Sequence, residues 1–154
     1  MRITTRGRYA LRAMANLAVS RTSKPKSIRV IAEEEEISPE FLEQIFFRLK
    51  KTGIVASTRG PGGGFRLVLD PAEITVRQIF DAVDEGINFT PCSSEEQDCD
   101  RMDICLVHDL WLEASEHFRS YFDSISLQDI MDRNEGRPYA DMLVTGEVGN
   151  LRGS

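Results

Sequence analysis

Residues 59–64 read Arg-Gly-Pro-Gly-Gly-Gly, and this run constrains the fold more than any other part of the sequence. Four glycines and one proline within five positions exclude a helix there, because glycine weakens a helix interior and proline breaks it. The flanking segments, 54–58 and 65–69, are short and rich in residues that favour strands. The sequence therefore predicts a β-hairpin with an unusually glycine-rich tip.

A phosphate-binding loop is one alternative for such a run. That loop would need a helix starting directly after the glycines and a Gly-Lys-Ser/Thr sequence, and the chain has neither. A plain flexible turn is the other alternative, and the arginines at positions 59 and 66 argue against it. We therefore keep the hairpin as the prediction.

Two short helices separated by a turn are predicted directly before the hairpin. The first covers 28–35, with Ser27 as its N-cap. The second begins at Ser38, another favourable N-cap, has Pro39 at its first helical position and ends before Gly53. A helix–turn–helix followed by a two-stranded wing is a unit that docks on DNA.

The rest of the chain is predicted to be mostly helical. Apolar residues recur at helical spacing in four further segments, 5–19, 75–84, 106–124 and 127–133. The predicted fold class is mainly α with one small β-hairpin. The predicted organisation is a winged helix–turn–helix domain over 1–85, a cysteine-bearing loop over 86–105, a dimerisation helix with a short terminal helix over 106–134, and a disordered tail over 135–154.

The second helix of the pair would enter the major groove with its N-terminus first. There Gln44 suits an adenine edge and Glu43 can accept from a cytosine amino group. Basic side chains suit phosphates, and an arginine at the base of the wing suits a narrow minor groove. The predicted DNA-contacting residues are Glu40, Phe41, Glu43, Gln44, Arg48, Lys51, Arg59, Gly60, Gly62 and Gly63.

Charge is distributed unevenly along the chain, whose net charge is −6. Residues 1–70 contain 13 basic and 7 acidic residues, whereas residues 71–154 contain 6 basic and 18 acidic residues. A basic half can neutralise phosphates while the acidic half faces away, with chance segregation as the alternative. The chain has no long uncharged apolar segment and no signal-peptide pattern, so we expect a cytoplasmic location and no membrane partner.

Three cysteines, Cys92, Cys99 and Cys105, lie within 14 residues, and His108 follows them closely. Their odd number argues against a disulfide scaffold, and thiolates with an imidazole form a metal-binding set. Structural zinc usually takes ligand pairs two to four residues apart, a spacing that Cys92 and Cys99 do not have. The wider spacing favours an iron–sulfur cluster over zinc, which stays the alternative.

Three motifs resemble the IscR-type transcription regulators: Thr-Arg-Gly-Arg-Tyr-Ala-Leu at 5–11, Ser-Pro-Glu-Phe-Leu-Glu-Gln-Ile-Phe at 38–46 and Arg-Gly-Pro-Gly-Gly-Gly-Phe at 59–65. That group includes iron–sulfur-cluster regulators, nitric-oxide sensors such as NsrR and cluster-free cysteine-metabolism repressors such as CymR. The resemblance covers roughly residues 1–130. It implies base or nearby backbone contacts for Ser38, Glu40, Phe41, Glu43 and Gln44, and minor-groove contacts for Arg59 and the wing glycines.

The resemblance also implies a cluster type. A histidine three residues after the last cysteine is the IscR-like pattern, and it implies a 2Fe–2S cluster held by Cys92, Cys99, Cys105 and His108. Members that sense nitric oxide share the cysteines, differ in the fourth ligand and carry a 4Fe–4S cluster, which is the alternative. Iron–sulfur assembly machinery is then a further expected partner.

The predicted 106–124 helix has an apolar stripe longer than a wing domain can cover, which favours pairing with a two-fold mate over packing on its own core. The predicted interface residues are Leu106, Leu110, Trp111, Ala114, Phe118, Tyr121 and Phe122. The leading hypothesis is a homodimeric, cluster-controlled regulator that binds a palindromic operator in double-stranded DNA. An iron–sulfur redox protein is the alternative from another class. An enzyme is not expected, because the sequence has no paired base and nucleophile.

Overall fold

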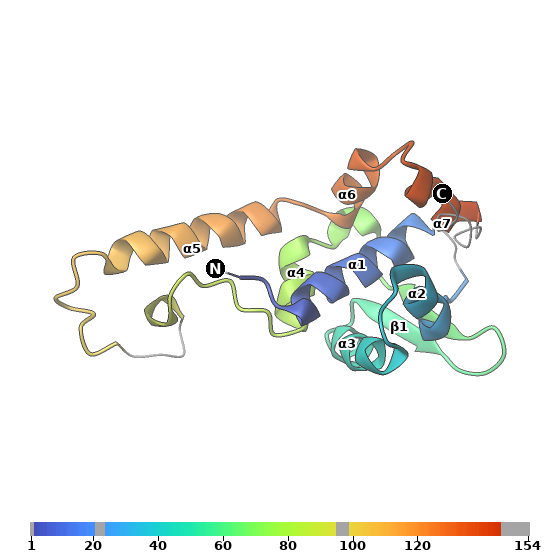
Figure 1. The fold of residues 1–154 in the computed structure, drawn as a ribbon, viewed down its shortest axis with the longest axis horizontal. Coiled ribbons are helices and arrows are strands. Elements are labelled where there is room, and N and C mark those ends of the chain that lie inside the picture. Colours follow the sequence, from blue (N-terminus) through green and yellow to red (C-terminus); the bar gives the residue numbers. More distant parts are fainter. Residues whose placement is uncertain (1, 21–23, 95–98, 146–154) are drawn as a thin grey trace.

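The computed structural model describes residues 2–20, 24–94 and 99–145 (Figure 1). Its helices and strands are α1 (Thr5–Val19), α2 (Ile28–Glu35), α3 (Pro39–Lys51), β1 (Val55–Thr58), β2 (Gly64–Leu67), α4 (Val76–Ala82), α5 (His108–Asp123), α6 (Leu127–Arg133) and α7 (Pro138–Thr145). Short 3-10 turns lie at Pro71–Glu73 and Pro91–Ser93. The predicted fold class, mainly α with a small hairpin, is confirmed.

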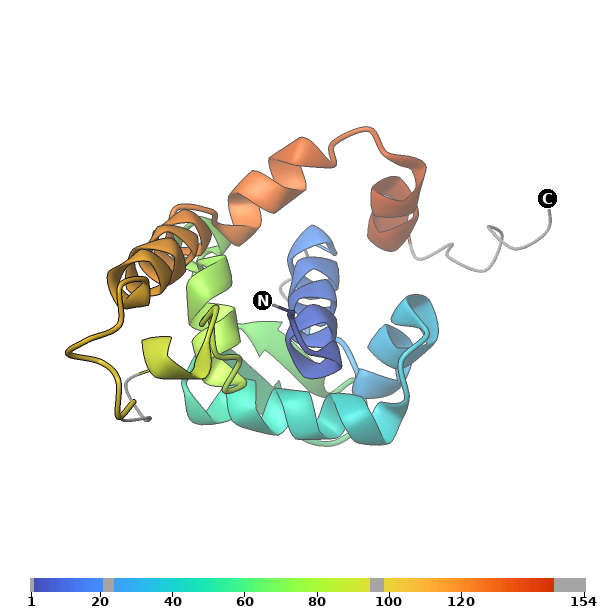
Figure 2. The same ribbon diagram turned by 60° about the vertical axis from the view of Figure 1, so that its left-hand side comes forward.

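Helix α1 lies at the centre of the main core and contacts α2, α3, α4 and α6 (Figure 2). Its buried face meets the apolar faces of the neighbouring helices around one core. The largest fully buried side chains in this core are Phe46, Met14, Ile31, Leu42, Ile45, Leu49, Ile74, Ile79 and Leu127. Because α1 touches each of these helices, it fixes their relative positions. Helix α5 extends away from this core as an arm (Figure 1).

The hairpin pairs β1 with β2 antiparallel, from Val55 opposite Leu67 to Thr58 opposite Gly64. Lys26 extends this small sheet, because it exchanges two backbone hydrogen bonds of 2.9 and 2.8 Å with Phe65. A Cβ atom on Gly64 would lie 2.3 Å from the Lys26 carbonyl oxygen, and the φ of Gly64 is +151°. Glycine is therefore required at this position both by the close approach and by the backbone conformation.

A half-buried polar network ties the base of the wing to α1 and α2. The Nζ of Lys26 donates to Asn16 Oδ1 at 2.7 Å and to Ser20 Oγ at 2.9 Å, and it also pairs with the Glu34 carboxylate. Since only about a tenth of the Lys26 and Glu34 side chains is exposed, the two charges compensate each other away from water. The wing is thus held by polar contacts as well as by its two strands.

The segment 138–145 forms helix α7, whereas the sequence predicts disorder over 135–154. Its Leu143 is buried, and the hydroxyl of Tyr139 donates to the Glu34 carbonyl at 2.9 Å and to Glu35 Oε1 at 2.8 Å. Burial, followed by the hydrogen bond to Glu35, raises the pKa of Tyr139 far above its usual value, so the phenol stays a donor. These few contacts with α1 and α2 order a segment whose sequence has little periodicity. The rest of the predicted tail, 146–154, lies outside the described residues.

Candidate DNA interface and metal-binding segment

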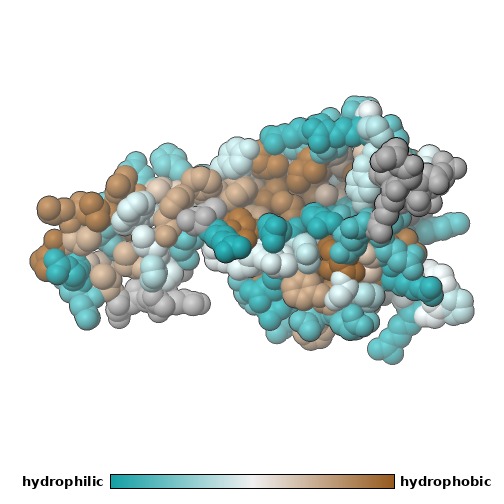
Figure 3. Space-filling model, viewed as in Figure 1, coloured by the Kyte–Doolittle hydropathy of each residue, from teal (hydrophilic) through white to brown (hydrophobic). Residues whose placement is uncertain are grey.

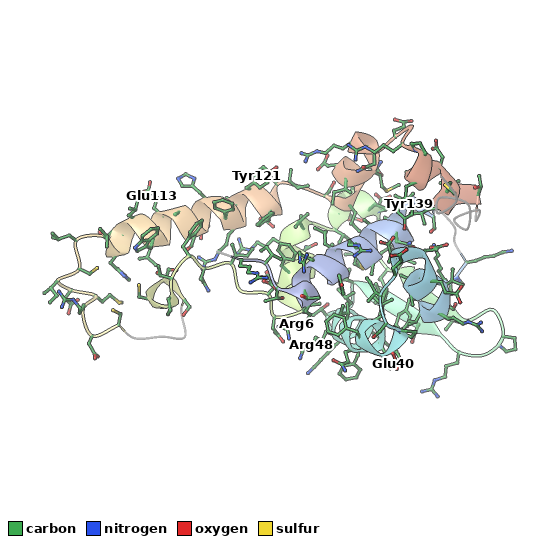
Figure 4. All side chains as sticks on the ribbon, viewed as in Figure 1. Arg6, Glu40, Arg48, Glu113, Tyr121 and Tyr139 are labelled. Atoms are coloured by element: carbon green, nitrogen blue, oxygen red, sulfur yellow. The ribbon has the colours of Figure 1, made fainter. Side chains whose placement is uncertain are left out.

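The exposed face of α3 carries most of the side chains predicted to meet bases. Glu40, Glu43 and Gln44 are exposed, and Figure 4 shows Glu40 projecting outward from α3. Ser38 caps the helix by accepting a hydrogen bond of 3.1 Å from the Phe41 backbone N–H. Capping fixes where the helix begins, and its free N–H groups there favour a phosphate.

Two residues of α3 make contacts within the chain that the sequence did not predict. Phe41 is half-buried and packs edge-on against Tyr9, with ring centroids 5.7 Å apart. Arg48, predicted to bind a phosphate, forms an ion pair with Asp84 instead. Asp84 has a φ of +55° and lies just after α4, a helix that packs against α3. The local charge of Arg48 is therefore already compensated within the chain.

The wing lies beside α3 at the same side of the molecule in Figures 1 and 2. Arg59 is exposed at its base, and Gly60 and Gly62 at its tip have positive φ values of 90° and 74°. Within the described parts of the chain, Lys50, Lys51 and Arg59 have no ion-pair partner. A helix with exposed polar side chains and a basic wing therefore face the same way, as docking on a duplex requires.

The four predicted metal ligands lie in the segment before α5 and in its first residue, His108. Cys92, Cys99 and Cys105 are free, half-buried thiols, and the Cys92 Sγ lies 3.1 Å from Thr90 Oγ1. His108 is only 7% exposed, and its buried Nδ1 has no hydrogen-bond partner among the described residues. Over 2–20, 24–94 and 99–145, however, no three His, Cys, Asp or Glu side chains are close enough together to hold a metal ion. The structure therefore brings no three of the four predicted ligands together within its described residues.

The segment around Cys92 is anchored on the inner face of α5. The buried Ser115 hydroxyl accepts from the Phe89 backbone N–H at 3.1 Å and donates to Ser93 Oγ at 3.3 Å. The Phe89 ring stacks on Trp111 and packs against Phe118, at centroid distances of 6.3 and 5.1 Å. These contacts fix one end of the cysteine-bearing loop to the arm.

The cysteine-bearing loop starts directly after a junction with α1 and α3. The carboxylate of Glu85, 4% exposed, accepts from both the backbone N–H and the hydroxyl of Thr4, the N-cap of α1. Arg6 donates to the Asp84 carbonyl at 3.0 Å, and Arg48 of α3 pairs with the Asp84 carboxylate. Figure 4 shows Arg6 and Arg48 close together at this point. Sequence reasoning missed Asp84 and Glu85, because only the fold brings them to both helices.

The arm exposes an apolar surface, seen at the left of Figure 3. Leu106 is fully exposed, and Leu110, Phe118 and Tyr121 are 56%, 41% and 53% exposed. The other predicted interface residues, Trp111, Ala114 and Phe122, are half-buried, and Phe122 packs edge-on against Phe80 at 5.3 Å. The apolar residues of α5 thus serve two faces, one toward the chain itself and one open.

A helix–turn–helix with an exposed second helix and an adjacent basic wing defines a winged-helix DNA-binding protein. The Rrf2 family model, described as an iron-dependent transcriptional regulator, matches residues 3–133. The chain therefore belongs to the Rrf2 family, and the resemblance to IscR-type transcription regulators is confirmed. None of the described helices has the length and apolar run needed to cross a membrane.

Relatives and solved structures agree with this assignment. The HTH-type transcriptional regulator IscR of Aliivibrio salmonicida is 43% identical over 141 residues, which cover 92% of this chain and 83% of the relative. The structure of IscR from T. potens superposes with a TM-score of 0.71 at 28% identity, over 88% of this chain and 89% of that one. The cysteine regulator CymR of B. subtilis gives 0.70 at 28% identity, over 86% and 98%. The relatives are named as transcriptional regulators, in keeping with the expectation of a non-enzyme.

We predict that Lys51 contributes to the salt dependence of DNA binding and that Arg48 does not. The logarithm of the association constant falls linearly with the logarithm of the salt concentration. Lys51→Ala should make this slope less steep by about 0.9 for each lysine in the complex, because each lost lysine removes one phosphate contact. Arg48→Ala, the matched control on the same helix, should leave the slope unchanged, since Asp84 already neutralises that charge. Fluorescence anisotropy with a duplex across a salt series measures both. Equal slope changes in the two variants would contradict this placement.

Proposed function

We propose that this Rrf2-family regulator is a homodimer whose binding to a palindromic operator depends on an iron–sulfur cluster held by Cys92, Cys99, Cys105 and His108. The observation that carries the cluster proposal is His108, a buried histidine at the start of α5 whose Nδ1 lacks a hydrogen-bond partner in the described part of the chain. A buried nitrogen without a hydrogen-bond partner lowers the stability of the fold unless the nitrogen binds a ligand.

The donor set fits a 2Fe–2S cluster. Three thiols and one imidazole are the ligands of soft and borderline metal centres, and the three thiols are free. When bound, such a cluster supplies a redox-active and chemically labile centre whose loss releases its ligands. No three of these ligands lie close enough together among the described residues, so closure of the cysteine-bearing segment around His108 is the step that this chain must perform.

Closure of that segment can change the position of α3, the helix proposed to enter the major groove, through the junction at Asp84 and Glu85. The loop that carries Cys92 starts directly after Glu85, whose carboxylate holds Thr4 at the start of α1. Asp84 pairs with Arg48 on α3. A shift of the loop is therefore transmitted through Asp84 and Glu85 to α3, the helix that presents Gln44. The loop and this helix together would form a two-state element whose equilibrium depends on cluster occupancy.

The open apolar face of α5 supports the dimer. Leu110 and Tyr121 are more than half exposed, although both are large and apolar in character. A two-fold partner laying its own α5 against this stripe would remove both from water and set two α3 helices at the spacing of a palindrome. Leu112 lies across the helix from this stripe, among the polar residues Asp109, Glu116 and Ser120.

We expect the chain, purified without oxygen, to be brown with visible charge-transfer absorption and to contain about two iron and two sulfide per chain. His108→Ala should change the spectrum and speed cluster loss, because one ligand is gone. His117→Ala is the matched control, since that histidine lies on the same helix but is 78% exposed. Absorption spectra and metal analysis measure both variants.

Two outcomes would decide against this cluster assignment. A colourless protein with one zinc per chain would replace the cluster by a structural metal while leaving DNA binding intact. Identical spectra and decay rates for His108→Ala, His117→Ala and the natural chain would remove His108 from the ligand set.

We also expect Leu110→Asp to convert the dimer to a monomer, because a carboxylate would be buried without a partner in the apolar interface. The same substitution at Leu112 is the control and should leave the dimer intact. Sedimentation velocity gives the mass of each variant, and circular dichroism checks that both remain folded. A Leu110→Asp protein that sediments as a dimer, or a natural chain that sediments as a monomer, would contradict the proposed interface.

A further inference from the structure

Phe47 is the one large apolar side chain of α3 that is mostly in water. It is 69% exposed, whereas Leu42, Ile45, Phe46 and Leu49 are fully buried. The half-buried Phe41 packs on Tyr9, so every other leucine, isoleucine and phenylalanine of this helix packs in or against the core. Phe47 does not contribute to the core, and its position on the exposed face needs another reason.

That face is the one proposed to enter the major groove. Phe47 follows Gln44 by three positions and Glu40 by seven, so all three side chains lie along the same side of α3. The basic residues that follow, Lys50 and Lys51, are exposed and have no ion-pair partner among the described residues. The surface on the C-terminal side of Phe47 therefore suits phosphates, whereas Glu43, one turn before Phe47, is the residue predicted to accept from a cytosine amino group.

We propose that Phe47 determines specificity by contacting the 5-methyl group of thymine. The methyl group is the apolar feature that the four base pairs present at the major-groove edge, and phenylalanine is one of the side chains that read it. Three residues along a helix span about 4.5 Å, close to the 3.4 Å between base pairs. The thymine in question should therefore lie within one or two base pairs of the base read by Gln44. This inference rests on the proposed docking of α3 in the groove.

The test uses the full-length dimer and an operator obtained by selection from random duplexes. One thymine position at a time is replaced by deoxyuridine, at the equivalent sites of both half-sites. This replacement removes only the methyl group. The natural chain should lose about fourfold in affinity per half-site at one position, the effect of one methyl group leaving an apolar contact. Phe47→Ala should bind more weakly overall and show no further loss at that same position. Phe47→Leu should retain part of the discrimination.

Controls separate this inference from the function on which it rests. Because the side chain is exposed, Phe47→Ala should keep the thermal midpoint and the sedimentation of the natural chain. A Phe47→Ala protein that suffers the same deoxyuridine losses as the natural chain would overturn the inference while leaving DNA binding intact. A change of its oligomeric state would also overturn it, since Phe47 would then belong to a protein contact. If no operator can be selected at all, the proposed function fails and the inference fails with it.

Discussion

The buried carboxylate of Glu85 is the contact on which the rest of the structure depends. It fixes the first turn of α1 by accepting a hydrogen bond from the Thr4 backbone N–H. It also packs closely on Gly7, because a Cβ atom added there would lie 2.6 Å from Glu85 Oε2. Because α1 organises the core, this one residue sets the helix against which α2, α3, α4 and α6 pack. Glu85 is also the last residue before the cysteine-bearing loop. The DNA-binding domain and the proposed sensing segment thus share a single anchored point.

Helix α5 forms an arm with two apolar faces, and this distinguishes the second half of the chain from the wing and the helices around α1. One side of α5 is occupied by its own chain, through Ser115, Phe89 and Phe80. The other side remains apolar and open at Leu110 and Tyr121. A helix with apolar residues on two faces cannot be fully covered by one small domain. The open apolar face of α5 is therefore suited to contact a partner.

The local rules of the sequence predicted most of the fold, and the contacts between distant segments account for what they missed. Caps at Ser27 and Ser38 and the glycine-rich run at 59–64 define the wing domain from nearest neighbours alone. Helix α7 was missed because Tyr139 bonds to residues more than a hundred positions away. The pairing of Arg48 with Asp84 was missed for the same reason. Phe47 could have been found, because Leu42, Ile45, Phe46 and Leu49 share one face at helical spacing and position 47 lies outside that face.

We propose that occupancy of the site formed by Cys92, Cys99, Cys105 and His108 controls how the dimer binds DNA. The most direct measurement is the affinity of a single preparation for its selected operator, by anisotropy at fixed salt without oxygen, before and after the cluster is removed by chelation. The account predicts that the affinity changes by at least about tenfold, or that operator selection with the two forms yields different sequences. Equal affinities and the same selected operator for both forms would contradict it.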